Sequence, residues 1–108
     1  MADLVAVCPT SDVPENSVKS FEVGTAVVAV YNLGGEFYVT DNECTHGAAS
    51  LAEGLLDGDV IECCLHFGAF NVKTGAVVAP PCNIPLRTYK VTVQDGKVMV
   101  DLDKEAGE

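Results

Sequence analysis

Both histidines of this 108-residue chain lie beside a cysteine, and this pairing is the strongest chemical signal in the sequence. Cys44 and His46 form the first pair, and Cys63 and His66 form the second. Sixteen residues, 47–62, separate the two pairs. Thiolate and imidazole are the donors that hold zinc and iron–sulfur centres, so the four side chains are predicted to ligate a metal centre.

The distribution of the donors distinguishes between two kinds of centre. A structural zinc finger usually takes two cysteines from one loop and two histidines from a helix. Here each segment offers one cysteine and one histidine. That layout suits two irons side by side, one bound by the two thiolates and the other by the two imidazoles. A [2Fe–2S] cluster is therefore the preferred interpretation, and a zinc-binding structural or interaction module is the alternative.

The elements that must position these segments are predicted to be short strands. Runs rich in β-branched residues alternate with turn residues, and helical patterning is weak. Asn32–Gly35 and Asp95–Gly96 offer turns for two hairpins, the second of type I′. Residues 48–56 offer one helical turn, which Gly54 and Gly58 interrupt. The pattern favours an all-β fold with strands at residues 4–7, 18–23, 26–31, 36–39, 60–63, 89–93 and 98–102, and loops at 42–50, 64–68 and 79–81.

Length and composition favour one globular domain spanning residues 1–108. The chain is 48% hydrophobic, yet its longest apolar run, 25–31, is too short to cross a bilayer. The first residues lack the basic and apolar regions of a signal peptide, so a cytoplasmic location is expected. Five cysteines are an odd number, and nothing marks secretion, which favours metal ligation over a disulfide framework.

The charge of the chain is strongly acidic, with 16 Asp and Glu against 6 Lys and Arg. No Lys or Arg occurs from Ser20 to Val72, a stretch that holds eight acidic residues. Such a surface repels phosphate backbones and argues against a nucleic-acid partner. It either attracts a partner with a basic patch or serves solubility alone.

Around the four donors the sequence resembles bacterial Rieske ferredoxins that serve aromatic-ring dioxygenases. Residues 41–47 (DNECTHG) resemble the first box of that family, and residues 61–70 (IECCLHFGAF) resemble the second. Residues 86–89 (LRTY), followed by a valine-rich hairpin, resemble its C-terminal end. The resemblance covers nearly the whole chain.

The resemblance implies a small Rieske domain of three antiparallel sheets, with the cluster held by two loops at one tip and covered by a third loop at 79–85. It also implies one Rieske [2Fe–2S] cluster bound by Cys44, His46, Cys63 and His66. The implied role is that of a one-electron carrier without catalytic residues, which would take electrons from an NAD(P)H-dependent flavoprotein reductase and pass them to a terminal oxygenase. A monomer is expected, because a small carrier must meet two partners in turn through weak contacts. The short apolar runs and the acidic charge argue against membrane and nucleic-acid partners.

Three cysteines are not assigned to the cluster. Cys64 stands where the family usually has proline, and Cys82 lies in the predicted covering loop. Both are interpreted as small space-filling residues, with a reactive or alternative-ligand role as the alternative. Cys8 is interpreted as a structural residue of the N-terminal strand.

Two neutral imidazoles leave the cluster less negative than a four-thiolate cluster, which raises its reduction potential. High-potential Rieske proteins place a serine and a tyrosine two and four residues after the second histidine. Gly68 and Phe70 stand there in this chain, and neither side chain donates a hydrogen bond. We therefore predict a potential near the low end of the Rieske range, roughly −150 mV.

No glycine-rich nucleotide-binding loop of the GxGxxG or Walker type occurs in the chain. Both histidines are used by the cluster, so no ligand set for a mononuclear iron is visible. The chain is therefore expected not to oxidise a substrate itself. A redox sensor, or a Rieske-type small subunit of another system, is the remaining alternative to the dioxygenase carrier.

Overall fold

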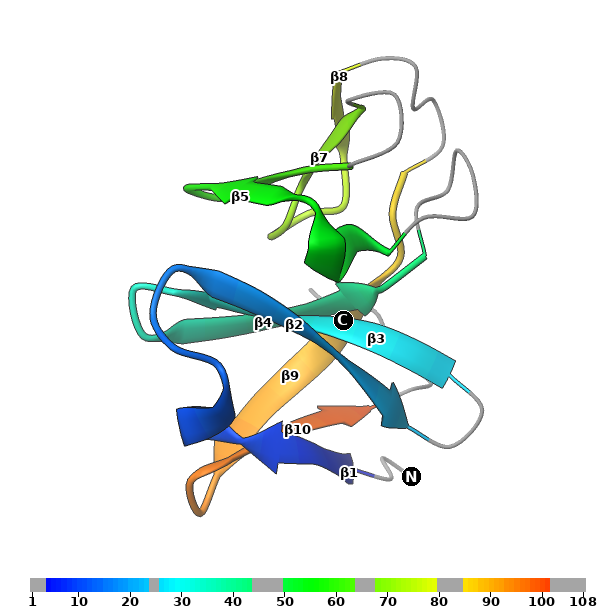
Figure 1. Ribbon diagram of the computed structural model, residues 1–108. Coiled ribbons are helices and arrows are strands. Elements are labelled where there is room, and N and C mark those ends of the chain that lie inside the picture. Colours follow the sequence, from blue (N-terminus) through cyan, green and yellow to red (C-terminus); the bar gives the residue numbers. More distant parts are fainter. Residues whose placement is uncertain (1–3, 24–25, 44–49, 64–67, 80–84, 102–108) are drawn as a thin grey trace.

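The computed structural model describes residues 4–23, 26–43, 50–63, 68–79 and 85–101. Within these ranges it contains ten strands, two single 3-10 turns and no α-helix (Figure 1). The turns are η1 (Thr10–Asp12) and η2 (Leu51–Glu53). The strands are β1 (Leu4–Pro9), β2 (Ser17–Val23), β3 (Ala26–Leu33), β4 (Glu36–Asp41), β5 (Leu55–Asp57), β6 (Val60–Glu62), β7 (Ala69–Asn71), β8 (Val77–Ala79), β9 (Thr88–Gln94) and β10 (Lys97–Asp101).

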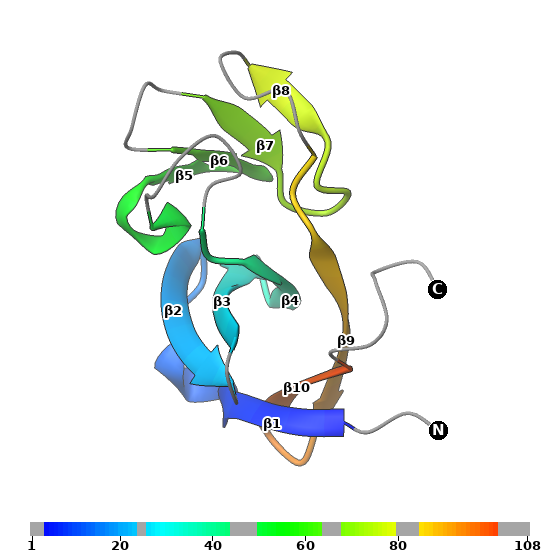
Figure 2. The same ribbon diagram turned by 90° about the vertical axis from the view of Figure 1, so that its right-hand side faces the viewer.

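All neighbouring strands pair antiparallel, in the orders β1-β10-β9-β4-β3-β2 and β5-β6-β7-β8. The six-stranded sheet curls on itself, as Figure 2 shows. Strands β4 and β9 join its halves through only two residue pairs, Val39 with Tyr89 and Thr40 with Thr88. The fold is therefore three small antiparallel sheets, β1-β10-β9, β2-β3-β4 and β5-β6-β7-β8, the first two of which meet at β4 and β9. This confirms the expected Rieske-type architecture.

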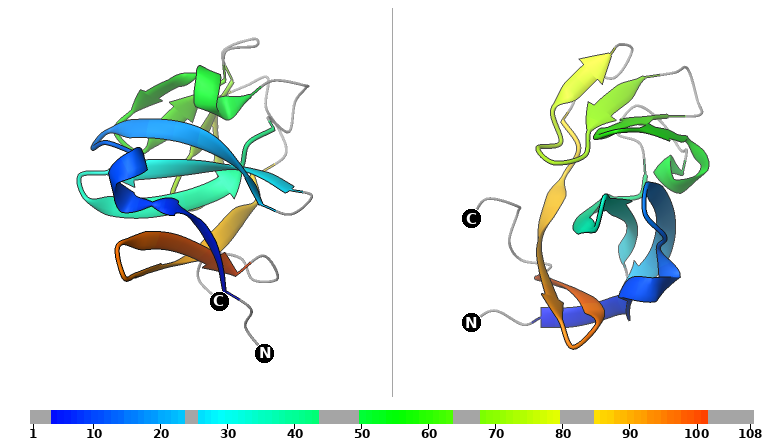
Figure 3. Two further views of the ribbon diagram at one scale, coloured as in Figure 1. Left: turned by 60° about the horizontal axis from the view of Figure 1, so that its bottom comes forward. Right: turned by 90° about the vertical axis from the view of Figure 1, so that its left-hand side faces the viewer.

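Strand β3 lies in the middle layer and serves two hydrophobic cores. Successive side chains of a strand point to opposite faces, so Val28 and Val30 enter one core while Ala29 and Tyr31 enter the other. All four side chains are completely buried. The β5–β8 sheet lies on one side of this layer and β1 and β10 lie on the other (Figures 1 and 3). The continuous apolar run of β3 follows from burial on both faces.

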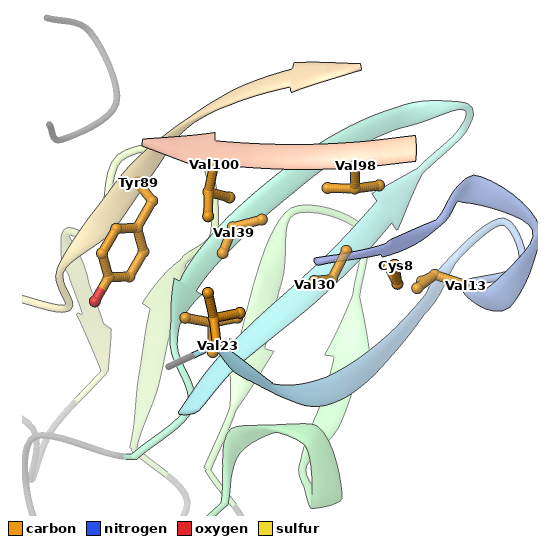
Figure 4. Close-up of a cluster of buried hydrophobic side chains, with 9 residues drawn as sticks. Cys8, Val13, Val23, Val30, Val39, Tyr89, Val98 and Val100 are labelled. Carbon is orange, nitrogen blue, oxygen red and sulfur yellow. The ribbon is translucent and has the colours of Figure 1, made fainter. Parts of the chain in front are cut away.

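The core between the two halves of the six-stranded sheet is built mostly of valines (Figure 4). Cys8 of β1 belongs to it and is 4% exposed. Burial, assisted by the nearby charge of Asp12, raises the pKa of the Cys8 thiol to about 11. This placement agrees with the structural role predicted for Cys8.

Seven strands lie where the sequence predicted them, and three were missed. The missed strands are β5, β7 and β8, each only three residues long. The predicted type I′ turn is confirmed, because Asp95 and Gly96 have φ values of 53° and 73°. The helical turn predicted at 48–56 is wrong in part: η2 is a single 3-10 turn, and β5 follows directly after Gly54. None of the described residues form a helix long and apolar enough to cross a membrane.

Candidate metal centre

Cys63 is the one predicted ligand that lies within the described residues. Cys44, His46 and His66 fall in segments 44–49 and 64–67, outside them. The described ranges accordingly hold no group of three or more potential metal ligands. The structure does describe the residues on either side of each segment, and their contacts show how the ends of the two segments are held together.

The first loop is closed by a hydrogen-bonded clamp around Asn42. Glu43 and Ser50 form an isolated antiparallel bridge across the ends of segment 44–49. The carbonyl oxygen of Asn42 accepts the Leu51 N–H at 2.8 Å, and its side-chain Oδ1 accepts the Ala52 N–H at 3.1 Å. Asn42 Nδ2 donates to Ser50 Oγ at 2.9 Å. The strand before the loop and the turn after it are therefore held together as one unit.

The second loop is closed by its own backbone. The Cys63 N–H donates to the Gly68 carbonyl oxygen at 2.6 Å, across segment 64–67. Farther from segment 64–67, strands β6 and β7 pair, with Ile61 opposite Phe70. The Cys63 side chain is completely buried and belongs to the same core as Leu51, Ile61 and Phe70.

These surroundings fit an iron–sulfur ligand. A buried thiolate is costly unless a cation binds it, and iron of a cluster supplies that compensation. The sulfur of Cys63 lies at the end of a strand, among packed apolar side chains, where water is excluded. The donor type and the buried position of Cys63 therefore fit the ligand role predicted for it.

The predicted covering loop, 79–85, also begins and ends beside this sheet. Ala79 pairs with Ala69 at the end of β8. Leu86 donates its N–H to the Gly75 carbonyl oxygen at 2.8 Å, and its side chain is buried in the same core as Cys63. The structure of residues 80–84, including Cys82, lies outside the described ranges, as does that of Cys64.

Phe70 and Gly68, which bear on the reduction potential, both lie within the described residues. Phe70 is completely buried in the core around Cys63, and Gly68 is buried too. The Cys63 N–H donates its hydrogen bond to the Gly68 carbonyl oxygen, so the backbone amide of Cys63 has its acceptor within the protein.

A second set of contacts ties the end of β4 to β9. The Tyr89 hydroxyl donates a short hydrogen bond to Asp41 Oδ1, and the Asp41 N–H donates to the Arg87 carbonyl oxygen at 3.0 Å. The Arg87 guanidinium lies 5.0 Å from the centre of the Tyr89 ring. Burial first, and the Asp41 carboxylate second, raise the pKa of Tyr89 to about 12.

The supporting roles of Asn42, Ser50, Asp41 and Tyr89 are not apparent from the sequence. None of them stands out by type or spacing, and only their contacts in the folded chain reveal their role. The available signal was local: an Asn two residues before a predicted ligand is a residue type that bonds nearby backbone N–H groups.

Acidic side chains precede both segments that hold the predicted ligands. Of the eight acids between Ser20 and Val72, five are exposed and three are half-buried. Glu43 and Glu62, which directly precede Cys44 and Cys63, are exposed and half-buried respectively. The surface near both loops is therefore negative.

Comparison with known proteins identifies the family. The family model described as "Rieske [2Fe-2S] domain" matches residues 3–90. Ferredoxin CarAc of Metapseudomonas resinovorans is 49% identical over 100 residues, covering 92% of this chain and 94% of the relative. The ferredoxin component of the p-cumate 2,3-dioxygenase system of Pseudomonas putida is 44% identical, covering 94% and 88%.

Solved structures agree in fold. The Sphingomonas yanoikuyae B1 ferredoxin superposes with a TM-score of 0.88 at 43% identity, covering 92% of this chain and 98% of that chain. A chain from the complex of reduced oxygenase and oxidized ferredoxin in carbazole 1,9a-dioxygenase gives a TM-score of 0.86 at 46% identity, covering 97% of each. The chain therefore belongs to the Rieske [2Fe–2S] domain family, as a ferredoxin that carries single electrons on one Rieske-type cluster and is not itself a catalytic subunit.

Proposed function

We propose that Cys44, His46, Cys63 and His66 are the four ligands of the cluster. The observation that supports this most strongly is the burial of Cys63, whose N–H bonds the Gly68 carbonyl oxygen across segment 64–67. Cys63 shares its core with Leu51 of η2, the turn that follows segment 44–49. The bound cluster supplies one-electron redox chemistry at its mixed thiolate and imidazole coordination. The chain's own residues hold it, exclude water from Cys63 and set the surrounding charge.

Single-residue variants test the ligand set. Cys44→Ser and Cys63→Ser should each lose the cluster, seen as loss of visible absorbance and of acid-labile sulfide. Cys64→Ser is the matched control, because it changes the thiol next to Cys63, and Cys8→Ala changes a buried thiol in the other core. Both controls should keep the cluster. Retention in either ligand variant, or loss in Cys64→Ser, would contradict the assignment.

We further propose that the carrier takes electrons from an NAD(P)H-dependent flavoprotein reductase and delivers them to a terminal aromatic-ring oxygenase. Relatives that are 41–46% identical are named as ferredoxins of carbazole, p-cumate, biphenyl and 3-phenylpropionate/cinnamic acid dioxygenase systems. The exposed acids near both loops support a partner with a basic contact surface. The imidazole edges of His46 and His66 are the proposed exit for the electron.

Reconstitution tests the proposed partners. The purified chain is mixed with NADH, a flavoprotein reductase and the oxygenase of a related dioxygenase system, and the hydroxylated product is measured. Product should form only when the cluster-loaded chain is present, and Cys63→Ser should not replace it. A chain that dithionite reduces but no such reductase or oxygenase accepts would instead favour a sensor or another electron-transfer system.

The environment of the cluster also predicts its midpoint potential. Gly68 and Phe70 offer no side-chain hydrogen bond to the cluster sulfurs, and the nearby acids disfavour the more negative reduced state. We expect a midpoint near the low end of the Rieske range, roughly −150 mV, in a redox titration at neutral pH. A clearly positive midpoint would contradict this reasoning.

A further inference from the structure

The turn η2 contacts both sides of the cluster site. On one side, its first two backbone N–H groups bond Asn42, which directly precedes the first ligand-bearing loop. On the other side, Leu51 packs completely buried in the core that contains Cys63. The turn ends at Gly54, whose N–H donates to the Leu51 carbonyl oxygen at 3.0 Å.

Gly54 lies directly against the backbone of Glu62, the residue before Cys63. A methyl group added at Gly54 would lie well within 3.0 Å of the Glu62 carbonyl oxygen and 3.1 Å from its carbonyl carbon. The backbone of Gly54 is extended, with φ −82° and ψ −169°, which any residue adopts. Glycine is therefore required here for space and not for backbone conformation.

The pairing register places this contact beside the ligand. Leu55 pairs with Glu62 in the β5–β6 ladder. Continued by one residue, this antiparallel register sets Gly54 opposite Cys63. Only a residue without a side chain lets the two backbones approach this closely. The absence of a side chain at Gly54 therefore sets the distance between η2, which follows segment 44–49, and Cys63.

We propose that η2 is the spacer that fixes the separation of the two loops that carry the ligands. Asn42 holds the start of η2 by hydrogen bonds, and Gly54 at its end packs against the backbone of Glu62. Gly54 and Asn42 are then positioning residues for the cluster, although neither is a ligand. The inference rests on the proposed ligand set. Separation of the loops matters because a Rieske cluster takes one thiolate and one imidazole from each of them.

Gly54→Ala, compared with Gly75→Ala, tests the spacer. Gly75 offers a matched clash, since an added methyl would lie well within 3.0 Å of the Leu86 carbonyl oxygen and 3.1 Å from its carbonyl carbon. Gly75 also has φ +78°, so its substitution strains the backbone as well. Gly75→Ala therefore disturbs the fold at least as much, but no predicted ligand directly follows its contact residue.

Three readouts separate positioning from stability: the rate of cluster loss to an iron chelator, the EPR spectrum of the reduced protein, and the thermal midpoint by circular dichroism. Gly54→Ala should lose its cluster at least tenfold faster than the wild type and show shifted g values. Gly75→Ala, whose contact residue Leu86 ends the predicted covering loop, should lower the thermal midpoint and shift the g values less than Gly54→Ala does. Equal acceleration in both variants with an unchanged spectrum would overturn the proposal.

Variants of Asn42 decide the matter if Gly54→Ala cannot be isolated with a cluster. Asn42→Ala removes the side-chain bonds to Ala52 and Ser50 without creating a clash, and should also shift the g values and speed cluster loss. Asn42→Asp keeps the acceptor for Ala52 and should restore most of the retention. Ser50→Ala should have the smaller effect, because the bonds of Asn42 to the backbone of η2 remain.

An Asn42→Ala protein with wild-type g values and wild-type cluster retention would overturn the spacer role. A wild-type protein that shows no Rieske spectrum would instead contradict the proposed ligand set, so the two failures are distinguishable.

Discussion

At the residue scale, the buried thiol of Cys8 predicts how stability depends on pH. Its pKa is raised from 9.0 to about 11, so above pH 9 the unfolded chain loses a proton that the folded chain keeps. The stabilisation is complete below pH 9 and is lost as pH rises from about 9 to 11, by at most about 3 kcal/mol.

Urea unfolding of the wild type and Cys8→Ala between pH 8 and 11 checks this. Tyrosines with raised pKa values are common to both proteins, so the difference between the two curves isolates Cys8. The variant should show the shallower decline. Parallel curves would show that Cys8 titrates alike in the folded and unfolded states.

The Tyr89 hydroxyl predicts a stability difference between two tyrosine variants. Tyr89 is 4% exposed and donates to the Asp41 carboxylate, which joins β9 to β4. Tyr89→Phe should lower the free energy of unfolding by about 1–3 kcal/mol. Tyr38→Phe is the control, because its bond to Glu36 is solvent-exposed, and should cost less than about 1 kcal/mol. Equal losses would mean that the bond between Tyr89 and Asp41 stabilises the fold no more than the exposed bond between Tyr38 and Glu36.

The proposed ligands are apparent in the sequence, whereas the residues that support them are not. Cys44, His46, Cys63 and His66 stand out because their types are rare in the chain and their spacing is specific. Asn42 and Gly54 have ordinary types for a loop, and their roles depend on contacts with Ala52 and Glu62 that arise only in the folded chain. The sequence marks Gly54 only as an interruption of a helical turn, whereas in the fold glycine is required because the Glu62 backbone leaves no space for a side chain.

At the scale of elements, strands with clear periodicity were predictable and the shortest were not. The β9–β10 hairpin alternates over its whole length and has a turn sequence that specifies its type. The apolar run of β3 predicts a strand. It does not show that the two faces of the strand pack into different cores. Strands β5, β7 and β8 are too short to show a period of two, and their pairing with β6 defines them.

The turn of the β9–β10 hairpin predicts a local stability effect with no effect on the cluster. Gly96 has φ +73° with open space around it, so Gly96→Ala adds strain without a clash. It should destabilise the fold by about 1 kcal/mol in urea unfolding and leave the reduced EPR spectrum unchanged. Asp95→Asn is the control, because asparagine tolerates the same φ, and should keep the stability. A changed spectrum in Gly96→Ala would mean that this hairpin is coupled to the cluster.

At the scale of the whole molecule, the β2-β3-β4 layer lies between the β5–β8 sheet, which adjoins Cys63, and the valine-rich core with β1 and β10 (Figure 1). Of the eight acids between Ser20 and Val72, four lie from η2 to β6, in the part of the fold that adjoins Cys63: Glu53, Asp57, Asp59 and Glu62. The family and fold could therefore be inferred from sequence, while the layering required the structure. The monomeric state, the cytoplasmic location and the single domain over residues 1–108 stay predictions.

The charge distribution predicts how fast electrons reach a basic partner. Reduction by a flavoprotein reductase should slow severalfold as ionic strength rises, because screening weakens long-range attraction. Glu53→Lys in η2 and Asp57→Lys in β5, both at exposed positions, should each lower the rate constant measured by stopped flow. Glu22→Lys changes the charge equally on β2 and is the control. Equal effects of all three would indicate net charge alone and no preferred face.

The ligand set is tested most directly by the iron and acid-labile sulfide content of the purified protein, together with the EPR spectrum of its dithionite-reduced form. Two irons and two sulfides per chain are expected, with hyperfine couplings from two imidazole nitrogens. A colourless protein that contains zinc, no sulfide and no dithionite-induced signal would contradict the assignment of Cys44, His46, Cys63 and His66 to a shared iron–sulfur cluster.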